Sequence, residues 1–415
     1  MKVASQERGQ ALILIVFAII GLFGITGLAV DGGMAYSDRR YAQNAADNAA
    51  LAAALANSRG KDANAAALGA AKTNGFNNNG ATNTVKVTMV SAPGCPFSGT
   101  GKDITVQITS KIQTYFGTVV GIRQITNVVE AVTRSCTAYS GPPFPGNAIV
   151  ALGPTGTGFN AVGTTDWKVE GGGIFSNSSS SPSVDCKGAA SVDAPALTAV
   201  GTIATKCDSN VGTVTPGAAP YAYEGWSLLM PATPDCLGTA IQQGGYWYPD
   251  SNPVRAKSGS RVAFIGDMTF KPGLYCVTNS PGSYHGTING TWVTFYLMRA
   301  DFAMKFNGGG NLTAQCPATG DYAGVLMFSS PVMVGGVLQN TQAVDLRGNG
   351  TGAITGSVLL PSASITLFGN SSGAAINSQI VGYNVNSGGN ADIYVNYDAR
   401  DNFQTSYPGW LNLLK

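Results

Sequence analysis

The pattern of hydrophobic and polar positions changes sharply after residue 30. Residues 11–30 (ALILIVFAIIGLFGITGLAV) contain no charged side chain. As a helix rising about 1.5 Å per residue, they span the roughly 30 Å hydrocarbon core of a bilayer. Lys2 and Arg8 precede this segment and Asp31 follows it. By the positive-inside rule, residues 1–10 are cytoplasmic and the bulk of the chain lies outside the cell membrane. We therefore predict a single-pass anchor with membrane lipid as a partner, a cleaved signal peptide or a buried core helix being the alternatives.

Three glycines recur at every third position within this apolar segment, at Gly21, Gly24 and Gly27. Small residues allow helices to approach each other closely in lipid. The spacing therefore favours a helix-packing face and a homo-oligomer formed through the N-terminal helix. The alternative is that these glycines are only tolerated in a lipid-facing helix, because glycine is common in membrane helices.

The next segment is rich in Ala, Leu, Gln and Arg, which favour helix. We predict a helix over 34–57, with a stripe of small apolar side chains at three- and four-residue spacing. A second, shorter Ala-rich helix is expected at 63–73. Gly32 and Gly33 separate the apolar segment from the first of these helices.

Period-two alternation then predicts two neighbouring antiparallel strands at 85–90 and 104–108 and a third strand at 125–134. Residues 115–122 read as a short amphipathic helix between strands. Together these elements predict a small α+β domain over 31–140. A Pro- and Gly-rich linker at 141–146 ends it, because its three prolines cannot continue a helix or a central strand.

Three short motifs in the N-terminal region carry a family resemblance. They are ERGQA at 7–11, LAVD at 28–31 and QNAADNAALAAA at 43–54. This order resembles the N-terminal segment of TadG-like Flp pilus-assembly proteins of the tight-adherence (Tad) system. A TYF run followed by Gly-Ile, between two strands, extends the resemblance to about residue 135.

The resemblance implies a bacterial inner-membrane or envelope protein linked to pilus assembly, adhesion or secretion. It implies other pilus-assembly or envelope proteins as partners and carries no catalytic residue with it. Long TadG-type proteins often have a von Willebrand A domain, whose metal site needs a D-x-S-x-S loop. This sequence has no such loop, so metal-dependent adhesion through that domain is not expected.

Beyond the linker, short apolar runs alternate with Gly, Asn and Ser turns. Gly348, Gly369 and Gly389 are 21 and 20 residues apart. A repeat of this length is what one coil of a parallel β-helix produces. We predict a mostly β domain of this kind over 147–396, with an irregular insertion at about 207–267 and a C-terminal cap at 397–415. A β-sandwich or jelly roll is the alternative.

Composition narrows the partners. Charged residues make up 11% of the chain and the net charge is +2 without a basic cluster, which excludes nucleic acid as a partner. The seven cysteines form no CxxC or CxxH pair, so disulfides are favoured over zinc. Connectivity is open from sequence alone. Our preferred pairs join sequence neighbours: Cys95 with Cys136, Cys186 with Cys207, and Cys276 with Cys316.

Candidate chemistry is sparse. Tyr246, Trp247 and Tyr248 offer flat apolar faces for stacking on sugar rings of a surface polysaccharide, or they pack a loop onto the scaffold. His285 is the only histidine and has no nucleophile motif near it. We predict no catalytic, cofactor-binding or metal site.

The sequence thus favours a non-enzymatic, membrane-anchored envelope protein that presents a β-rich domain for adhesion or surface assembly. One alternative is a membrane-tethered β-helical carbohydrate-active enzyme. A second alternative is a pilin-like structural filament subunit.

Overall fold

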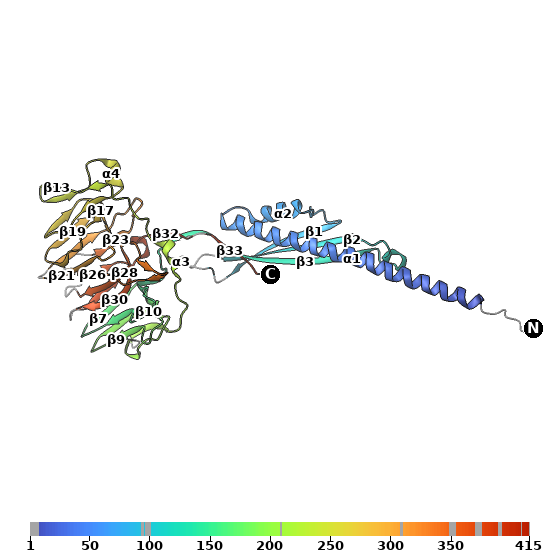
Figure 1. The fold of residues 1–415 in the computed structure, drawn as a ribbon, viewed down its shortest axis with the longest axis horizontal. Coiled ribbons are helices and arrows are strands. Elements are labelled where there is room, and N and C mark those ends of the chain that lie inside the picture. The colour runs from blue at the N-terminus through green and yellow to red at the C-terminus, as the bar shows by residue number, and fades with distance from the viewer. Residues whose placement is uncertain are drawn as a thin grey trace, which may run out of the picture. The chain divides into compact units, whose positions relative to one another are not determined.

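The computed structural model describes residues 8–92, 95, 101–207, 210–307, 310–347, 354–369, 376–388, 392–407 and 409–414. The chain divides into two compact units. Unit 1 comprises Met1–Tyr139 and Tyr407–Lys415, and unit 2 comprises Ser140–Ser406. Figure 1 labels the helices and strands of both units.

Unit 1 is built on one long helix, α1 (Arg8–Ser58). Its 51 residues correspond to a length of about 75 Å. The expected separation of the apolar segment from a helix over 34–57 is wrong, since α1 runs through Asp31, Gly32 and Gly33 without a break. A helical glycine costs only about 1 kcal/mol relative to alanine, which the long helical segments on both sides outweigh. In the described residues, α1 is the helix long and apolar enough to cross a membrane.

The second half of α1 packs on an antiparallel sheet. The strands are β1 (Asn83–Ala92), β2 (Gly101–Gln113), β3 (Gln124–Cys136) and β33 (Trp410–Leu413), in that spatial order. The predicted antiparallel strands and the helix at 63–73 are confirmed, the latter as α2 (Ala63–Thr73), which Asp62 caps. Small side chains of α1 and α2 meet the inner face of the sheet at Ile104, Val106 and Ile108.

The amphipathic helix predicted at 115–122 is wrong. This segment contains a single 3₁₀ turn, η2 (Gly117–Val120), which buries none of its side chains. Gly121 ends the turn in the left-handed conformation with φ 86°, which a glycine adopts without strain.

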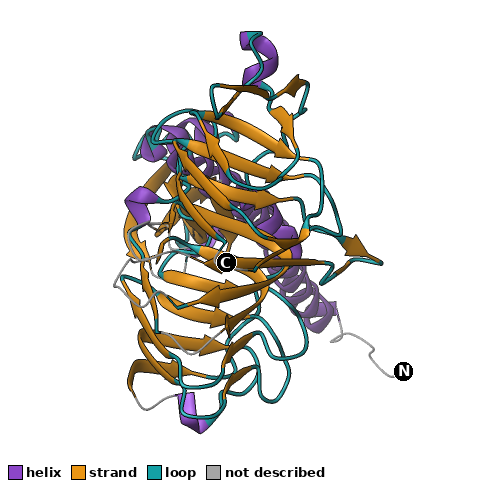
Figure 2. Cartoon of the chain, turned by 90° about the vertical axis from the view of Figure 1, so that its left-hand side faces the viewer, coloured by secondary structure: helices purple, strands orange, loops and turns teal. Residues whose placement is uncertain are grey.

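Unit 2 is a parallel β-helix, and its described residues form one curled sheet of 25 strands. In Figure 2 the strands of successive coils lie side by side. The strands are β5 (Asn147–Ala151), β6 (Phe159–Ala161), β7 (Asp166–Glu170), β8 (Gly173–Ser176), β9 (Val184–Cys186), β10 (Ser191–Ala199), β11 (Asn210–Thr215), β12 (Gly238–Thr239), β13 (Ile241–Gln243), β14 (Tyr246–Tyr248), β15 (Ser260–Val262), β16 (Met268–Phe270), β17 (Gly273–Val277), β18 (Gly282–Tyr284), β19 (Thr287–Thr291), β20 (Val293–Leu297), β21 (Ala303–Phe306), β22 (Asn311–Gln315), β23 (Val325–Ser329), β26 (Gln342–Arg347), β27 (Ile354–Thr355), β28 (Ser357–Phe368), β29 (Ile376–Asn377), β30 (Ile380–Gly388) and β31 (Ile393–Asn396).

The remaining elements are short. They are the helices α3 (Tyr223–Trp226) and α4 (Pro253–Lys257), the 3₁₀ turns η3 (Thr205–Cys207), η4 (Ser227–Leu229) and η5 (Ala399–Asp401), the hairpin strands β24 (Met333–Val334) and β25 (Val337–Leu338), and the paired strands β4 (Tyr139–Gly141) and β32 (Thr405–Tyr407).

Register in unit 2 confirms the predicted coil. Strand β28 pairs in parallel with β30, and partner residues such as Ser364 and Asn384 are 20 to 22 positions apart. Parallel pairing between successive coils rules out the alternative of a β-sandwich, whose strands are antiparallel. Two of the glycines that suggested the period, Gly348 and Gly389, lie outside the described residues.

The coils are not stacked in chain order. From β5 the chain winds one way through β8 and β10 to β11. It then crosses to the far end at β12 and winds back until β30 pairs with β5. The first and last coils of the chain are therefore neighbours inside the stack, as Figure 1 shows for the strands of unit 2.

This order corrects two expectations. The insertion expected at 207–267 contains β11, β12, β14 and β15, which are strands of the 25-stranded sheet. The cap expected at 397–415 is also wrong for its last residues, because β33 pairs with β3 in unit 1. In residues 207–267 the strands are short and lie between turn residues, so the sequence pattern does not reveal them. β33 has four residues, and its sequence does not indicate which strand it pairs with.

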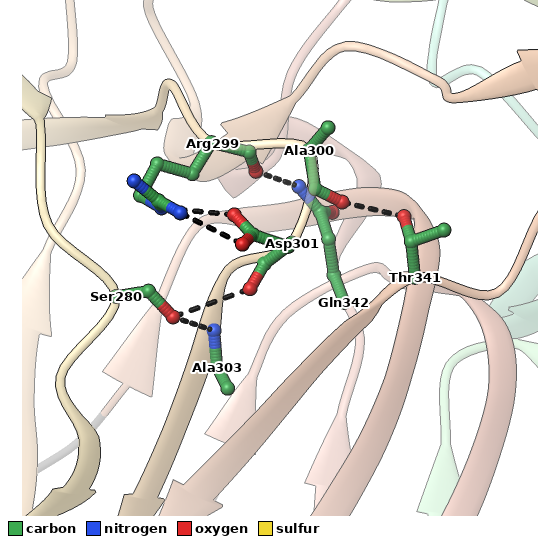
Figure 3. Close-up of polar contacts among 7 residues, drawn as sticks. All are labelled: Ser280, Arg299, Ala300, Asp301, Ala303, Thr341 and Gln342. Atoms are coloured by element: carbon green, nitrogen blue, oxygen red, sulfur yellow. Dashed lines mark hydrogen bonds and ion pairs between the residues drawn. The ribbon is translucent and has the colours of Figure 1, made fainter.

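Polar corners join the coils. Arg299 forms an ion pair with Asp301 at 2.7 Å, and its carbonyl oxygen accepts a 2.7 Å hydrogen bond from Gln342 Nε2 on the next coil. On the other side, the Ser280 hydroxyl donates to the Asp301 carbonyl and accepts from the Ala303 amide. Figure 3 shows how these contacts bring three coils together at one corner.

Candidate functional site

The Asp31 carboxylate accepts three backbone hydrogen bonds, through both of its oxygens. Its Oδ1 accepts a hydrogen bond from the Tyr115 amide at 2.8 Å. Its Oδ2 accepts from the amides of Phe116 at 3.0 Å and Gly117 at 2.7 Å. One side chain at the end of the apolar segment thus fixes the backbone of the loop between β2 and β3.

These bonds also affect proton affinity. Burial by itself would raise the pKa of the Asp31 carboxyl, but the amide hydrogen bonds from Tyr115, Gly117 and Phe116 together lower it below its ordinary value. The charged form is therefore the one that the loop recognises.

Gly27, one turn before Asp31, forms the second part of this junction. A Cβ atom built on Gly27 would lie 2.7 Å from Phe116 Cβ, closer than packed carbon atoms approach. Gly27 is buried, whereas Gly21 and Gly24 have no described atom within 4 Å of such a Cβ position apart from the nearby residues of α1 itself. Of the three glycines expected to form a helix-packing face, Gly27 packs within unit 1. For Gly21 and Gly24, packing against a second helix stays a proposal.

Further polar contacts hold α1 along the sheet. Asp38 accepts hydrogen bonds from the Ser110 hydroxyl at 2.9 Å and from Asn127 Nδ2 at 2.7 Å. Near the end of α1, Asn57 Nδ2 donates to the Ser135 hydroxyl at 3.0 Å. From Gly27 to Asn57 the helix is fixed to unit 1, while residues 12–26 are exposed throughout.

In unit 2 the predicted aromatic cluster divides in two. Trp247 packs against the solenoid core, which is the scaffold interpretation. Tyr246 and Tyr248 are exposed, and Lys271 Nζ lies 4.0 Å from the centre of the Tyr246 ring. Trp292 is also exposed, in the turn between β19 and β20, and its backbone has a left-handed φ of 59°. The sequence gives no sign of this conformation, so Trp292 is not among the aromatic residues predicted to stack on sugars.

Three disulfides are formed. Cys95–Cys136 and Cys186–Cys207 are bonded, in the pairs expected from sequence neighbours. The expected Cys276–Cys316 pair is wrong, because Cys276 is bonded to Cys236. Cys236 precedes the short strand β12, whose coil stacks on that of β15 and β17 and so brings Cys236 to Cys276. Cys316 is free and buried, and burial raises the pKa of its thiol.

The described residues contain no group of three or more His, Cys, Asp or Glu side chains that could hold a metal ion. His285 lies in the turn between β18 and β19 and is exposed. The three donors to the Asp31 carboxylate are backbone amides, so this contact holds and orients the loop backbone.

Residues 9–56 match the family model described as "Putative Flp pilus-assembly TadE/G-like". The match covers nearly all of α1, including Gly27, Asp31 and the alanines that pack on the sheet. Over this segment the chain is similar to TadE/G-like proteins, in agreement with the sequence motifs. No curated protein and no solved structure matches the chain.

Sequence reasoning recognised the LAVD and TYF motifs separately and did not predict that they touch. Asp31 ends the first motif, and the amides of Tyr115 and Phe116 belong to the second. Both motifs resemble the same family, and that shared resemblance is the feature of the sequence that could have indicated the contact.

Proposed function

We propose that this protein is a non-enzymatic, membrane-anchored component of Tad/Flp pilus assembly. Residues 11–30 cross the membrane with the N-terminus in the cytoplasm, and the β-helix lies outside and presents a surface for adhesion. The match of residues 9–56 to the TadE/G-like family supports this proposal.

The proposal of a membrane anchor rests on the difference between the two parts of α1. From Leu12 to Ile25 its large apolar side chains are exposed, whereas from Ala42 onward its small side chains are buried against the sheet. An exposed apolar surface of this extent is not stable in water. The first part of α1 therefore needs a lipid or protein environment that the described chain does not supply.

Site-specific labelling in cells tests the topology. We expect a cysteine placed at exposed Val90 in unit 1 to react with a membrane-impermeant maleimide added outside the inner membrane. A cysteine at Lys2 should react only after the membrane is permeabilised. Reaction of both positions in intact cells, or release of the chain by carbonate at high pH, would contradict a single-pass anchor.

For adhesion we propose that Tyr246 and Tyr248 stack on a surface polysaccharide. Both rings are exposed and Lys271 beside Tyr246 adds a positive charge, so an anionic polysaccharide fits best. Binding of detergent-solubilised protein to a polysaccharide array should fall at least tenfold in the double variant Tyr246→Ala/Tyr248→Ala. The matched control Val334→Ala/Val337→Ala, on the exposed β24–β25 hairpin, should bind normally.

The same array tests the carbohydrate-active enzyme alternative. A bound polysaccharide should keep its chain length during incubation with the protein. Shortening of the polysaccharide that scales with protein concentration would refute the non-enzymatic proposal.

A further inference from the structure

The segment between β2 and β3 exposes an unusual number of apolar side chains. We define the 115–122 loop as residues 115 to 122. In it Tyr115, Val119, Val120 and Ile122 are 70%, 86%, 75% and 54% exposed. The turn η2 at its centre buries none of its side chains. Because connecting loops in water are normally polar, packing inside the protein does not account for these residues.

The position of the loop on α1 is fixed by the contacts of Asp31 and Gly27. The three amide hydrogen bonds to Asp31 hold residues 115–117, and Phe116 packs against Gly27. The loop therefore lies beside residues 27–31, where the apolar segment of α1 ends. At this level α1 itself exposes Leu28 and Val30, so the apolar surface of the helix continues onto the loop.

We propose that the 115–122 loop is a second membrane-contacting element, with Val119, Val120 and Ile122 inserted at the boundary between acyl chains and headgroups. The inference rests on the proposed membrane anchor, because the end of that anchor sets the depth of the loop. The occupant is the lipid bilayer, since the apolar surface of the loop is continuous with that of the membrane-spanning segment.

The polar groups around the loop suit this depth. The Asp31 carboxylate, which would be costly to bring near lipid, has three amide donors. Tyr115 carries an aromatic ring with a polar hydroxyl, the type of residue enriched at membrane interfaces. Lys111 and Arg123 flank the loop, where cationic side chains meet lipid phosphates favourably.

Two contacts with the bilayer have a mechanical consequence. A single membrane helix is free to rotate about its axis and to change its tilt, whereas flanking interfacial residues fix both. The loop projects from one side of α1, so its insertion would hold unit 1 at a defined rotation above the membrane.

Lipid-quenching measurements test this directly on the full chain. Single cysteines at Val119, at Val90 and at Ile20 are introduced with Cys316→Ala and labelled with an environment-sensitive fluorophore. The protein is reconstituted into vesicles of phosphatidylcholine and phosphatidylglycerol that contain lipids with a doxyl quencher. Val90 is the matched control, because it is also an exposed valine of unit 1 but lies on β1 near the Cys136 end of the sheet, away from Asp31.

We expect the Val119 label to shift to shorter wavelength and to lose at least half of its emission to a shallow doxyl group. The Val90 label should behave as in water, and the Ile20 label should be quenched by a deep doxyl group. If Ile20 is quenched while Val119 responds like Val90, the loop proposal is refuted and the anchor stands. If Ile20 is not quenched, the anchor fails and the loop proposal fails with it. Protection of Val119 from both lipid and aqueous quenchers would assign the loop to a protein partner or a second copy and would also refute the proposal.

Discussion

The contacts of Asp31 with the loop depend on the negative charge of its carboxylate rather than on the size of its side chain. Both carboxylate oxygens face amide hydrogens, so an amide of the same size cannot replace it. In Asp31→Asn the side-chain NH2 group would point its hydrogens at backbone donors. We expect faster hydrogen–deuterium exchange of residues 115–117 by at least tenfold, measured by mass spectrometry in detergent.

The control for this variant is Asp62→Asn. Asp62 caps α2 by accepting from the amides of Asn64 and Ala65, and asparagine caps helices about as well as aspartate. Exchange at α2 should therefore stay unchanged. Equal effects of the two substitutions would mean that the Asp31 charge has no special role.

The lowered pKa of Asp31 predicts a pH dependence. A carboxyl whose pKa is lower in the folded state stabilises the fold above its unfolded pKa and loses this contribution as pH falls through the folded pKa. The difference in melting temperature between the wild type and Asp31→Asn should thus be constant above about pH 5 and shrink at more acidic pH. Thermal melts followed by circular dichroism between pH 3 and 8 measure it.

In unit 2 the neutral side chain of Gln342 is also held by specific hydrogen bonds. Its buried amide donates to the Arg299 carbonyl and its oxygen accepts from Ser329 at 2.8 Å. Gln342→Leu leaves both partners unsatisfied, which costs about 1–3 kcal/mol. Chemical denaturation should show this loss, whereas Gln339→Leu, at a half-buried position three residues away whose amide donates to the nearby Val337 carbonyl, should cost less than Gln342→Leu.

At the level of elements, the sequence predicts what depends on neighbours in the chain. The strands at 85–90 and 104–108 follow from alternation, and α2 follows from its alanines. In the 115–122 segment the spacing of apolar residues predicts a helix with a buried face, and the structure has only the short turn η2 there. Its conformation instead depends on Asp31, which is 84 residues away from Tyr115, and no local pattern contains that contact.

The contact between α1 and the loop makes Gly27 and Gly24 a matched pair. Gly27→Ala places a methyl group 2.7 Å from Phe116 Cβ and should displace the loop, whereas Gly24→Ala meets no described atom within 4 Å. We expect Gly27→Ala to increase exchange of the loop amides and Gly24→Ala to leave them unchanged while favouring helix by roughly 1 kcal/mol. If Gly24→Ala disturbs membrane-bound oligomers on native gels, the helix-packing proposal for that position gains support. A normal loop in Gly27→Ala would contradict the close packing seen here.

For the whole molecule, the repeat length was predictable and the stacking order was not. A period near 20 residues requires each coil to rest on a neighbour, but it does not say which neighbour. The pairing of β30 with β5 joins residues more than two hundred positions apart. Similarly, nothing local in residues 410–413 distinguishes a solenoid cap from an edge strand of unit 1. The Cys236–Cys276 bond was missed for the same reason.

The C-terminal strand provides the last test. β33 covers the end of β3, with Trp410 opposite Cys136 and Leu413 opposite Thr133. Removal of residues 409–415 would leave that end of β3 as a free edge with unpaired backbone groups. We expect calorimetry of the full chain in detergent to show a lower transition temperature for unit 1 and an unchanged one for the solenoid. A Gly/Ser tail of equal length should not restore it, because length without the strand's side chains supplies no packing. A lowered solenoid transition with unit 1 unchanged would instead support the cap expected from the sequence.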